Sequence, residues 1–242
     1  MQAKYEVAHV LERSWSSIET SDFNSWQVRT LRAIKDCRTM ALGGHVDECD
    51  GCGHVKISYN SCRNRHCPKC QGHKKVQWVE ARTSELLPVP YFHVVFTLPD
   101  ELNTLALHQP KIVYDALFKA AWQTIEAFTG KNNKPGMISI LHTWGQNLSL
   151  HPHVHCIIPG GFVTPNDVWK LSKNQGKFLF PVKAMSRVYR AKYVALLKAS
   201  VLEVPQTIYD SLFKKEWVVY AKRPFGTPAS VVEYLGRYTH KI

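Results

Sequence analysis

The sequence of 242 residues lacks several features that mark secreted, membrane-bound or nucleotide-hydrolysing proteins. Its first residues, MQAKYEVAHVLERSWSS, have neither the basic start nor the apolar centre and cleavage site of a secretory leader. No hydrophobic run approaches the length that crosses a bilayer. We also find no Walker-type phosphate loop, no internal repeat and no low-complexity segment. We therefore expect a cytoplasmic protein that has no membrane partner and does not draw on ATP.

Acidic residues are scarce in this sequence. There are 19 Asp and Glu against 31 Lys and Arg, which gives a formal net charge of +12. Such a balance favours a polyanionic partner, above all nucleic acid, because cationic side chains neutralise phosphates and release their counterions. With 45% hydrophobic and 21% charged residues, the composition is otherwise that of a globular protein with a packed core.

Long aliphatic side chains are sparse from Cys37 to Gly72, so this segment needs something other than an apolar core to hold it together. It contains two Cys-x2-Cys pairs, and this spacing lets four thiolates surround one Zn2+. The predicted ligands are Cys49, Cys52, Cys67 and Cys70. Disulfides are disfavoured because cytoplasmic thiols stay reduced. We therefore expect a small structural zinc site.

Further ligand types and basic residues lie in the same segment. A second tetrahedral zinc site would have the ligands Cys37, His45, Cys62 and His66. The cations that run through the segment include Arg63, Arg65, Lys69 and Lys74. Because a closed zinc site has no open coordination position, this module is expected to grip DNA phosphates rather than to perform chemistry. The alternative is that these cations only form a solvated face.

The remainder alternates helices and strands joined by short connections. Apolar spacing predicts helices within residues 1–36, 73–87, 111–128, 186–203 and 228–240, and strands within residues 91–99, 136–145, 149–161 and 216–225. This mixture predicts an α+β fold with helices packed on an antiparallel sheet. We place a helical and zinc-binding domain at residues 1–88 and a second domain at residues 89–242.

Three histidines occupy alternate positions of the run SLHPHVHCIIPGG. His151, His153 and His155 therefore point to one face of a strand, while Val154 points to the other. Neutral imidazoles side by side form part of a site for a divalent cation such as Mg2+ or Mn2+. The spacing of residues leaves the third ligand open between His151, Gln146 and Glu233.

Two tyrosines lie one turn apart on the final predicted helix. Tyr234 and Tyr238 have i, i+4 spacing, so they are neighbours on one helix face. Beside a cation that polarises a phosphodiester, a phenol can attack phosphorus and form a covalent phosphotyrosine. Arg237 lies between them as a candidate DNA contact.

These motifs carry a family resemblance. The segments YNSCRNRHCPKCQ, FHVVFTLP, HPHVHCIIPGG and YLGRYTH, in this order, resemble the two-tyrosine HUH transposases of insertion-sequence family ninety-one, which have an N-terminal zinc-binding domain. The resemblance implies a ferredoxin-like antiparallel sheet, metal ligands His153 and His155, and nucleophiles Tyr234 and Tyr238. It also implies that the two Cys-x2-Cys pairs belong to the zinc module. Members of this family continue past the tyrosine helix, so we expect a C-terminally truncated copy.

The resemblance implies a transposase that cleaves and joins single-stranded DNA at transposon ends through a 5′-phosphotyrosine. The 3′-OH that is released would be available to prime host replication. The chief alternative is a zinc-dependent DNA-binding protein without catalysis. A binuclear metal hydrolase fits less well because few ligands follow His155, and a three-carboxylate transposase would leave the histidines and tyrosines without a role.

Overall fold

The computed structural model describes residues 5–145, 147, 149–172, 179–222 and 227–236. These residues divide into two compact units, with a boundary between Ala81 and Arg82 inside helix α3. The sequence-based boundary was placed at residue 88. In the described residues, no helix is both long and apolar enough to cross a membrane.

The first unit has two antiparallel helices, a hairpin and the start of a third helix. Its elements are α1 (Val7–Ser14), α2 (Ser25–Lys35), β1 (Gly44–Glu48), β2 (Val55–Tyr59) and α3 (Pro68–Ser84), with short 3-10 helices at Trp15–Ser17, Thr20–Asp22 and Met40–Leu42. Helix α2 starts at a reciprocal cap, in which Asn24 and Gln27 each accept a hydrogen bond from the other's backbone N–H. The buried cluster of this unit consists of Ile34, Cys37 and Cys67. Because this apolar core is so small, the stability of the unit depends on its cysteines.

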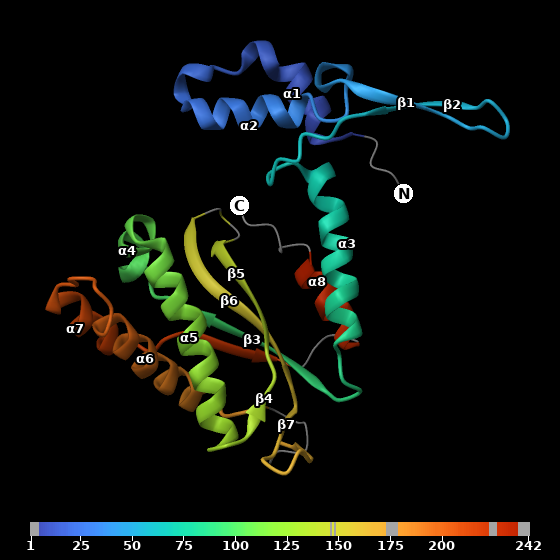
Figure 1. The fold of residues 1–242 in the computed structure, drawn as a ribbon. Coiled ribbons are helices and arrows are strands. Elements are labelled where there is room, and N and C mark those ends of the chain that lie inside the picture. The colour runs from blue at the N-terminus through green and yellow to red at the C-terminus, as the bar shows by residue number, and fades with distance from the viewer. Residues whose placement is uncertain (1–4, 146, 148, 173–178, 223–226, 237–242) are drawn as a thin grey trace. The chain divides into compact units, whose positions relative to one another are not determined.

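The second unit contains a four-stranded antiparallel sheet with strand order β5-β6-β3-β9 (Figure 1). Its strands are β3 (Tyr91–Thr97), β5 (Ile138–Trp144), β6 (Leu150–Pro159) and β9 (Val219–Lys222). Its helices are α4 (Asn103–His108), α5 (Pro110–Thr129), α6 (Val182–Lys198), α7 (Gln206–Lys214) and α8 (Pro228–Gly236), after a 3-10 helix at Asp100–Leu102. A separate small sheet pairs β4 (Lys134–Pro135), β7 (Gly161–Val163) and β8 (Trp169–Leu171).

The chain order β3-α5-β5-β6-α6-β9 with this strand order is the ferredoxin-like βαββαβ arrangement. All neighbouring strands pair antiparallel. The α+β fold with a ferredoxin-like antiparallel sheet, expected from the sequence, is therefore confirmed.

Alternation along the strands divides the sheet into two faces. Phe92, Val94 and Phe96 of β3 point into a core beneath α5 and α6, as do Val154 and Cys156 of β6. The residues between them, including the histidines of β6, therefore lie on the opposite face. Figure 1 shows α5 and α6 on one side of the sheet and α8 on the other.

Candidate functional site

The first unit brings four cysteine sulfurs together. The Sγ atoms of Cys37, Cys62, Cys67 and Cys70 all lie within 4.8 Å of one another. The Sγ of Cys70 is 3.5 Å from that of Cys37 and 3.6 Å from that of Cys62. A tetrahedral zinc ion with Zn–S bonds of about 2.3 Å places its sulfurs about 3.8 Å apart. This donor set therefore fits a structural zinc ion.

The β1–β2 hairpin assembles this cluster. At its open end the N–H of Arg38 donates to the carbonyl of Asn60 (3.0 Å), which brings Cys37 next to Cys62. The N–H of Cys62 then donates to the Sγ of Cys37 (3.4 Å). Cys67 and Cys70 follow at the start of α3, so they lie one turn apart beside the hairpin base.

The zinc ligands predicted from spacing need correction. Cys49 and Cys52 lie in the turn between β1 and β2 and are exposed, so they do not join Cys67 and Cys70. The five-residue strands of the hairpin hold its tip about 17 Å from its base, at about 3.4 Å per residue. Two similar Cys-x2-Cys pairs therefore have different surroundings, which the spacing alone does not reveal.

The second predicted site, Cys37, His45, Cys62 and His66, is not assembled either. Its two cysteines belong to the four-cysteine cluster. His45 is exposed on β1, where its Nε2 lies 3.6 Å from Asp47 Oδ2. His66 instead contacts the Trp26 ring edge-on, with centroids 5.3 Å apart. The structure thus supports one four-ligand site in the described part of this unit.

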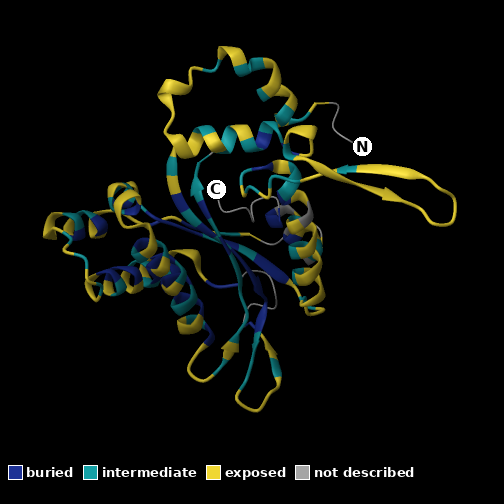
Figure 2. Cartoon of the chain, turned by 45° about the horizontal axis from the view of Figure 1, so that its top comes forward, coloured by how far each residue is buried: buried dark blue, intermediate teal, exposed yellow. Residues whose placement is uncertain are grey.

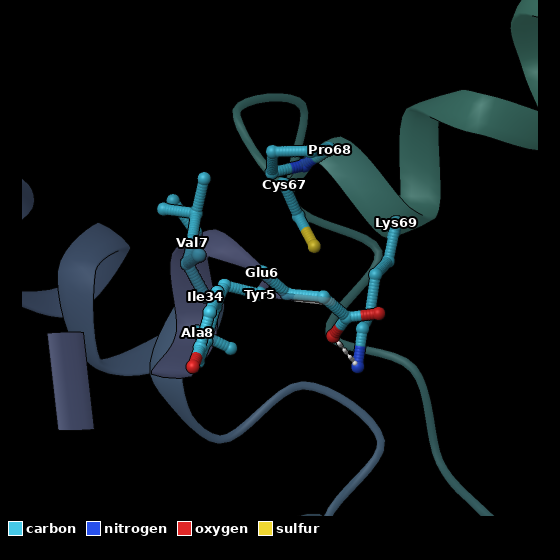
Figure 3. A pocket seen from close by; sticks show the side chains of 8 residues that line it. All are labelled: Tyr5, Glu6, Val7, Ala8, Ile34, Cys67, Pro68 and Lys69. Carbon is cyan, nitrogen blue, oxygen red and sulfur yellow. Dashed lines mark ion pairs between the residues drawn. The ribbon is translucent and has the colours of Figure 1, made fainter. Parts of the chain in front are cut away.

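The basic residues predicted to bind DNA differ in whether they already contact other side chains. Lys69 forms a 2.5 Å ion pair with Glu6 beside a pocket of about 310 Å3 (Figure 3). Arg63, Arg65 and Lys74 are exposed, but Arg65 donates from Nε to Nε2 of His66 (3.1 Å) and lies over the Trp26 ring. The remaining candidate, Arg237, lies outside the described residues. Their contact with DNA stays a prediction, and Lys69 would have to leave Glu6 to make it.

The second unit brings three histidines together. Ligand nitrogens of His142, His153 and His155 lie within 4.8 Å of one another. His142 of β5 pairs directly with His153 of β6 in the strand register. His142 is therefore the third candidate metal ligand, a position that the sequence left open. Of the earlier candidates, His151 and Glu233 are exposed, and Gln146 lies outside the described residues.

Hydrogen bonds fix the orientation of two of these rings. Nδ1 of His153 lies 2.6 Å from the carbonyl oxygen of His151, and because a carbonyl can only accept, this nitrogen carries the proton. Nδ1 of His155 lies 2.7 Å from Nε2 of His93 on β3, with the two rings stacked. Both bonds leave the Nε2 atoms of His153 and His155 for a cation, as in metal sites whose ligands have supporting hydrogen bonds.

Burial keeps these imidazoles neutral. Together with a smaller effect of the neighbouring imidazoles, it lowers the pKa of His142 to about 4 and that of His155 to about 2. Burial also lowers the pKa of His153 and of His93. Neutral imidazole is the form that binds metals. The cluster therefore has the protonation state of a metal site at neutral pH.

The helix that carries Tyr234 lies on the histidine face of the sheet. Helix α8 contacts β6, and its residues Val232 and Leu235 are fully buried. Ile157, which shares a sheet face with His155, is also fully buried. Tyr234 is a residue of α8, whereas Tyr238 lies outside the described residues. The helix that carries Tyr234 therefore contacts the strand that carries His153 and His155.

Two protein-family models match the chain. The model Zn_Tnp_IS91, a transposase zinc-binding domain, matches residues 10–98, and the model Y2_Tnp, "Putative transposase", matches residues 136–242. The chain belongs to this transposase family. The first range contains the four-cysteine cluster and the second contains His142, His153 and His155. The family expected from the sequence motifs is confirmed.

Two relatives match nearly the whole chain. The "Putative transposase y4qJ" of Sinorhizobium fredii (strain NBRC 101917 / NGR234) is 39% identical over 259 residues, covering 98% of this chain and 65% of the relative. The "Transposase for insertion sequence element IS801" of Pseudomonas savastanoi pv. phaseolicola is 29% identical over 242 residues, covering 93% of this chain and 57% of the relative. The chain thus spans less than two thirds of the length of either relative.

Solved structures of the conjugative relaxase TrwC resemble this chain weakly. The complex with a 27-mer DNA comprising the recognition hairpin and the cleavage site is 16% identical, covers 47% of this chain and 46% of that chain, and has a TM-score of 0.37. The metal-bound complex with OriT DNA is 16% identical, covers 47% and 44%, and has a TM-score of 0.35. Because these scores are low, the fold is assigned from the strand order and connections of the chain itself.

Proposed function

We propose that this chain is an HUH-type DNA endonuclease and strand transferase that acts on single-stranded DNA in transposition. The observation that carries the proposal is the convergence of His142, His153 and His155 on the face of the sheet where α8 packs. The net charge of +12 supports a DNA substrate. The activity is proposed for a chain that covers 65% and 57% of its relatives.

In the proposed reaction, the phenol oxygen of Tyr234 or Tyr238 attacks the scissile phosphorus. A tyrosine O–P bond forms, the P–O3′ bond breaks, and the departing oxygen takes up a proton to become a free 3′-OH. The phenol proton leaves to solvent. The DNA 5′ end then remains as a phosphotyrosine, and attack by a 3′-OH reverses the step to join strands. The ester conserves the energy of the broken bond, so no ATP is needed.

A divalent cation held by the three histidines would polarise the scissile phosphate and offset the charge that develops on it. The donor set indicates which cation. Imidazole nitrogens suit later transition ions, whereas Mg2+ prefers oxygen ligands. Among the two cations expected from the sequence, this site therefore favours Mn2+ over Mg2+.

The zinc module has a supporting role in this proposal. Its four-cysteine site would have no open coordination position, so zinc there would stabilise the fold. The exposed cation Arg63 lies in the zinc-site loop, between Cys62 and Cys67, and would be available to bind phosphates; Arg65 of the same loop would first have to release His66. The alternative function is zinc-dependent DNA binding without cleavage, and the same experiment separates the two.

The test uses a pool of random single-stranded oligonucleotides with a label at the 3′ end, incubated with the zinc-loaded chain and Mn2+. We expect a labelled protein–DNA adduct that survives denaturing electrophoresis, because a 5′-phosphotyrosine retains the 3′ fragment. The Y234F/Y238F double variant should bind the pool normally but give no adduct. An adduct of undiminished yield from that variant refutes the assignment of the nucleophiles. DNA binding without any adduct from the unaltered chain would favour the non-catalytic alternative.

A further inference from the structure

One face of the β1–β2 hairpin is mostly apolar, and no described residue of its own unit covers it. The strand register puts Val46 opposite Ile57, and the same face carries Val55, Tyr59, Gly44 and one charged residue, Glu48. The side chains of Val46, Ile57, Val55 and Tyr59 are exposed by 64%, 59%, 53% and 43%. The opposite face has His45, Asp47, Lys56 and Ser58. In Figure 2 this hairpin is coloured as exposed along nearly all of its length. Such segregation of apolar and polar residues is typical of a strand pair that packs against something.

The tip of the same hairpin has the backbone of a zinc knuckle. The N–H groups of Cys52 and Gly53 both donate to the carbonyl of Cys49, at 3.3 and 2.8 Å. Gly53 has a φ of +63°, a conformation that suits glycine. The turn therefore presents two exposed thiols, which make half of a tetrahedral zinc site.

The chain has no further cysteine to complete this half-site. All seven cysteines are described: four form the cluster at the base of the hairpin, and Cys156 is fully buried in the core of the second unit. Among the described residues, no group of three ligands within 4.8 Å includes Cys49 or Cys52. If the site is completed by thiols, the two further thiols come from another molecule.

We propose that two copies of this chain associate through their β1–β2 hairpins, with one zinc ion held at the tips by Cys49 and Cys52 of both copies. A two-fold axis along the hairpins would bring both tips to the zinc and place the two apolar faces against each other. The apolar face of each copy would then be covered by the same face of the other copy. This proposal does not depend on the cleavage chemistry.

The size of the hairpin face makes the association zinc-dependent. Two strands of five residues present a face of roughly 17 Å by 10 Å. A standard stable interface buries about 800 Å2 on each partner, which is several times more. Apolar packing between hairpins is therefore too small to hold a dimer alone, and metal binding would supply most of the free energy of association.

Zinc content and molar mass test this proposal on the full chain. At saturating zinc we expect the unaltered chain to bind about half a zinc ion per chain more than the C49S/C52S variant, because one ion is shared by two copies, whereas the four-cysteine site and the histidine cluster contribute equally to both. The unaltered chain should have a molar mass twice the 27.7 kDa of the chain, and the variant should be monomeric. Ile57→Lys should weaken the dimer although both thiols remain. Its matched control, Ser58→Lys, adds the same charge to the polar face and should leave the dimer intact.

Several outcomes would overturn the proposal. A monomer that binds one zinc ion per chain more than C49S/C52S would mean that the knuckle is completed within one chain, for example by histidines. A monomer that binds the same amount of zinc as C49S/C52S would mean that the knuckle binds none. A dimer that survives C49S/C52S, or whose dissociation constant is unchanged by Ile57→Lys, would have its interface elsewhere. Because none of these measurements involves DNA cleavage, they succeed or fail independently of the proposed function.

Discussion

His93 offers the sharpest test of the histidine cluster, because it contacts a proposed metal ligand without being one. Its Nε2 lies 2.7 Å from Nδ1 of His155, and the two rings are stacked with centroids 4.9 Å apart. If His155 binds a cation through Nε2, its Nδ1 carries a proton and donates to His93. The hydrogen bond then holds the ring of His155 and makes it a better ligand.

His93→Phe keeps an aromatic ring for stacking but removes the acceptor. Loss of such a supporting partner typically weakens metal binding about 10- to 100-fold, or by about 1.4 to 2.8 kcal/mol. We expect this loss in the Mn2+ affinity of the chain loaded with one equivalent of zinc for its four-cysteine site, measured by isothermal titration calorimetry. His93→Gln should retain most of the affinity, because its Oε1 can occupy the position of the imidazole Nε2 and accept the same hydrogen bond.

A structural role alone would give a different pattern. Both variants would then change thermal stability, and Mn2+ affinity would follow stability rather than the presence of an acceptor. The hydrogen-bond reasoning is refuted if His93→Phe binds Mn2+ within about threefold of the unaltered chain, a difference of less than about 0.7 kcal/mol.

Three further predictions address the metal sites and the buried imidazoles. His142→Ala should abolish measurable Mn2+ binding, whereas His151→Ala should not, because His151 contributes only a backbone carbonyl; calorimetry on both variants separates a three-histidine site from a two-histidine one. Cys67→Ser should release the zinc of the four-cysteine site and unfold the first unit, as measured by zinc release and circular dichroism, while Cys49→Ser should leave that zinc bound. Without a bound cation, His142 should lower the free energy of unfolding by about 3 kcal/mol as the pH falls from 6.5 to about 4, because the unfolded chain protonates this imidazole and the folded chain does not; His155, whose pKa is also lowered, should add to the fall over the same range. Urea titrations across this range should show a weaker dependence in His142→Gln, and an equal slope would contradict this assignment.

Local patterns predicted much of the second unit. The α+β class, the helix at Pro110–Thr129 and the strand at Leu150–Pro159 follow from apolar periodicity and from Pro and Gly at element ends. Alternation along the strand likewise placed His153 and His155 on one face. The β1–β2 hairpin was not predicted, since its strands are short and exposed and lie in a segment dominated by cysteine signals.

His142 shows why part of the site was beyond sequence reasoning. The run ILHTWG contains one histidine, which by itself is as consistent with a core position as with a ligand. Only the register of β5 against β6 places it opposite His153. A shift of the register by one residue would have turned it to the other face. The signal that could have found it was the antiparallel pairing of two strands joined by a short turn.

The amino-acid sequence by itself determined the chemical types of the ligands and which of them share one face of one element, because periodicity within a strand or a turn is a local property of the backbone. It also determined the charge that favours DNA and the motifs of the transposase family. Only the tertiary structure decided which elements meet. The hairpin joins Cys37 to Cys62 at its base and carries Cys49 and Cys52 away at its tip, and strand pairing adds His142 and His93 to the histidines of β6. The reason is that contacts between distant segments depend on register and packing, which no local spacing specifies.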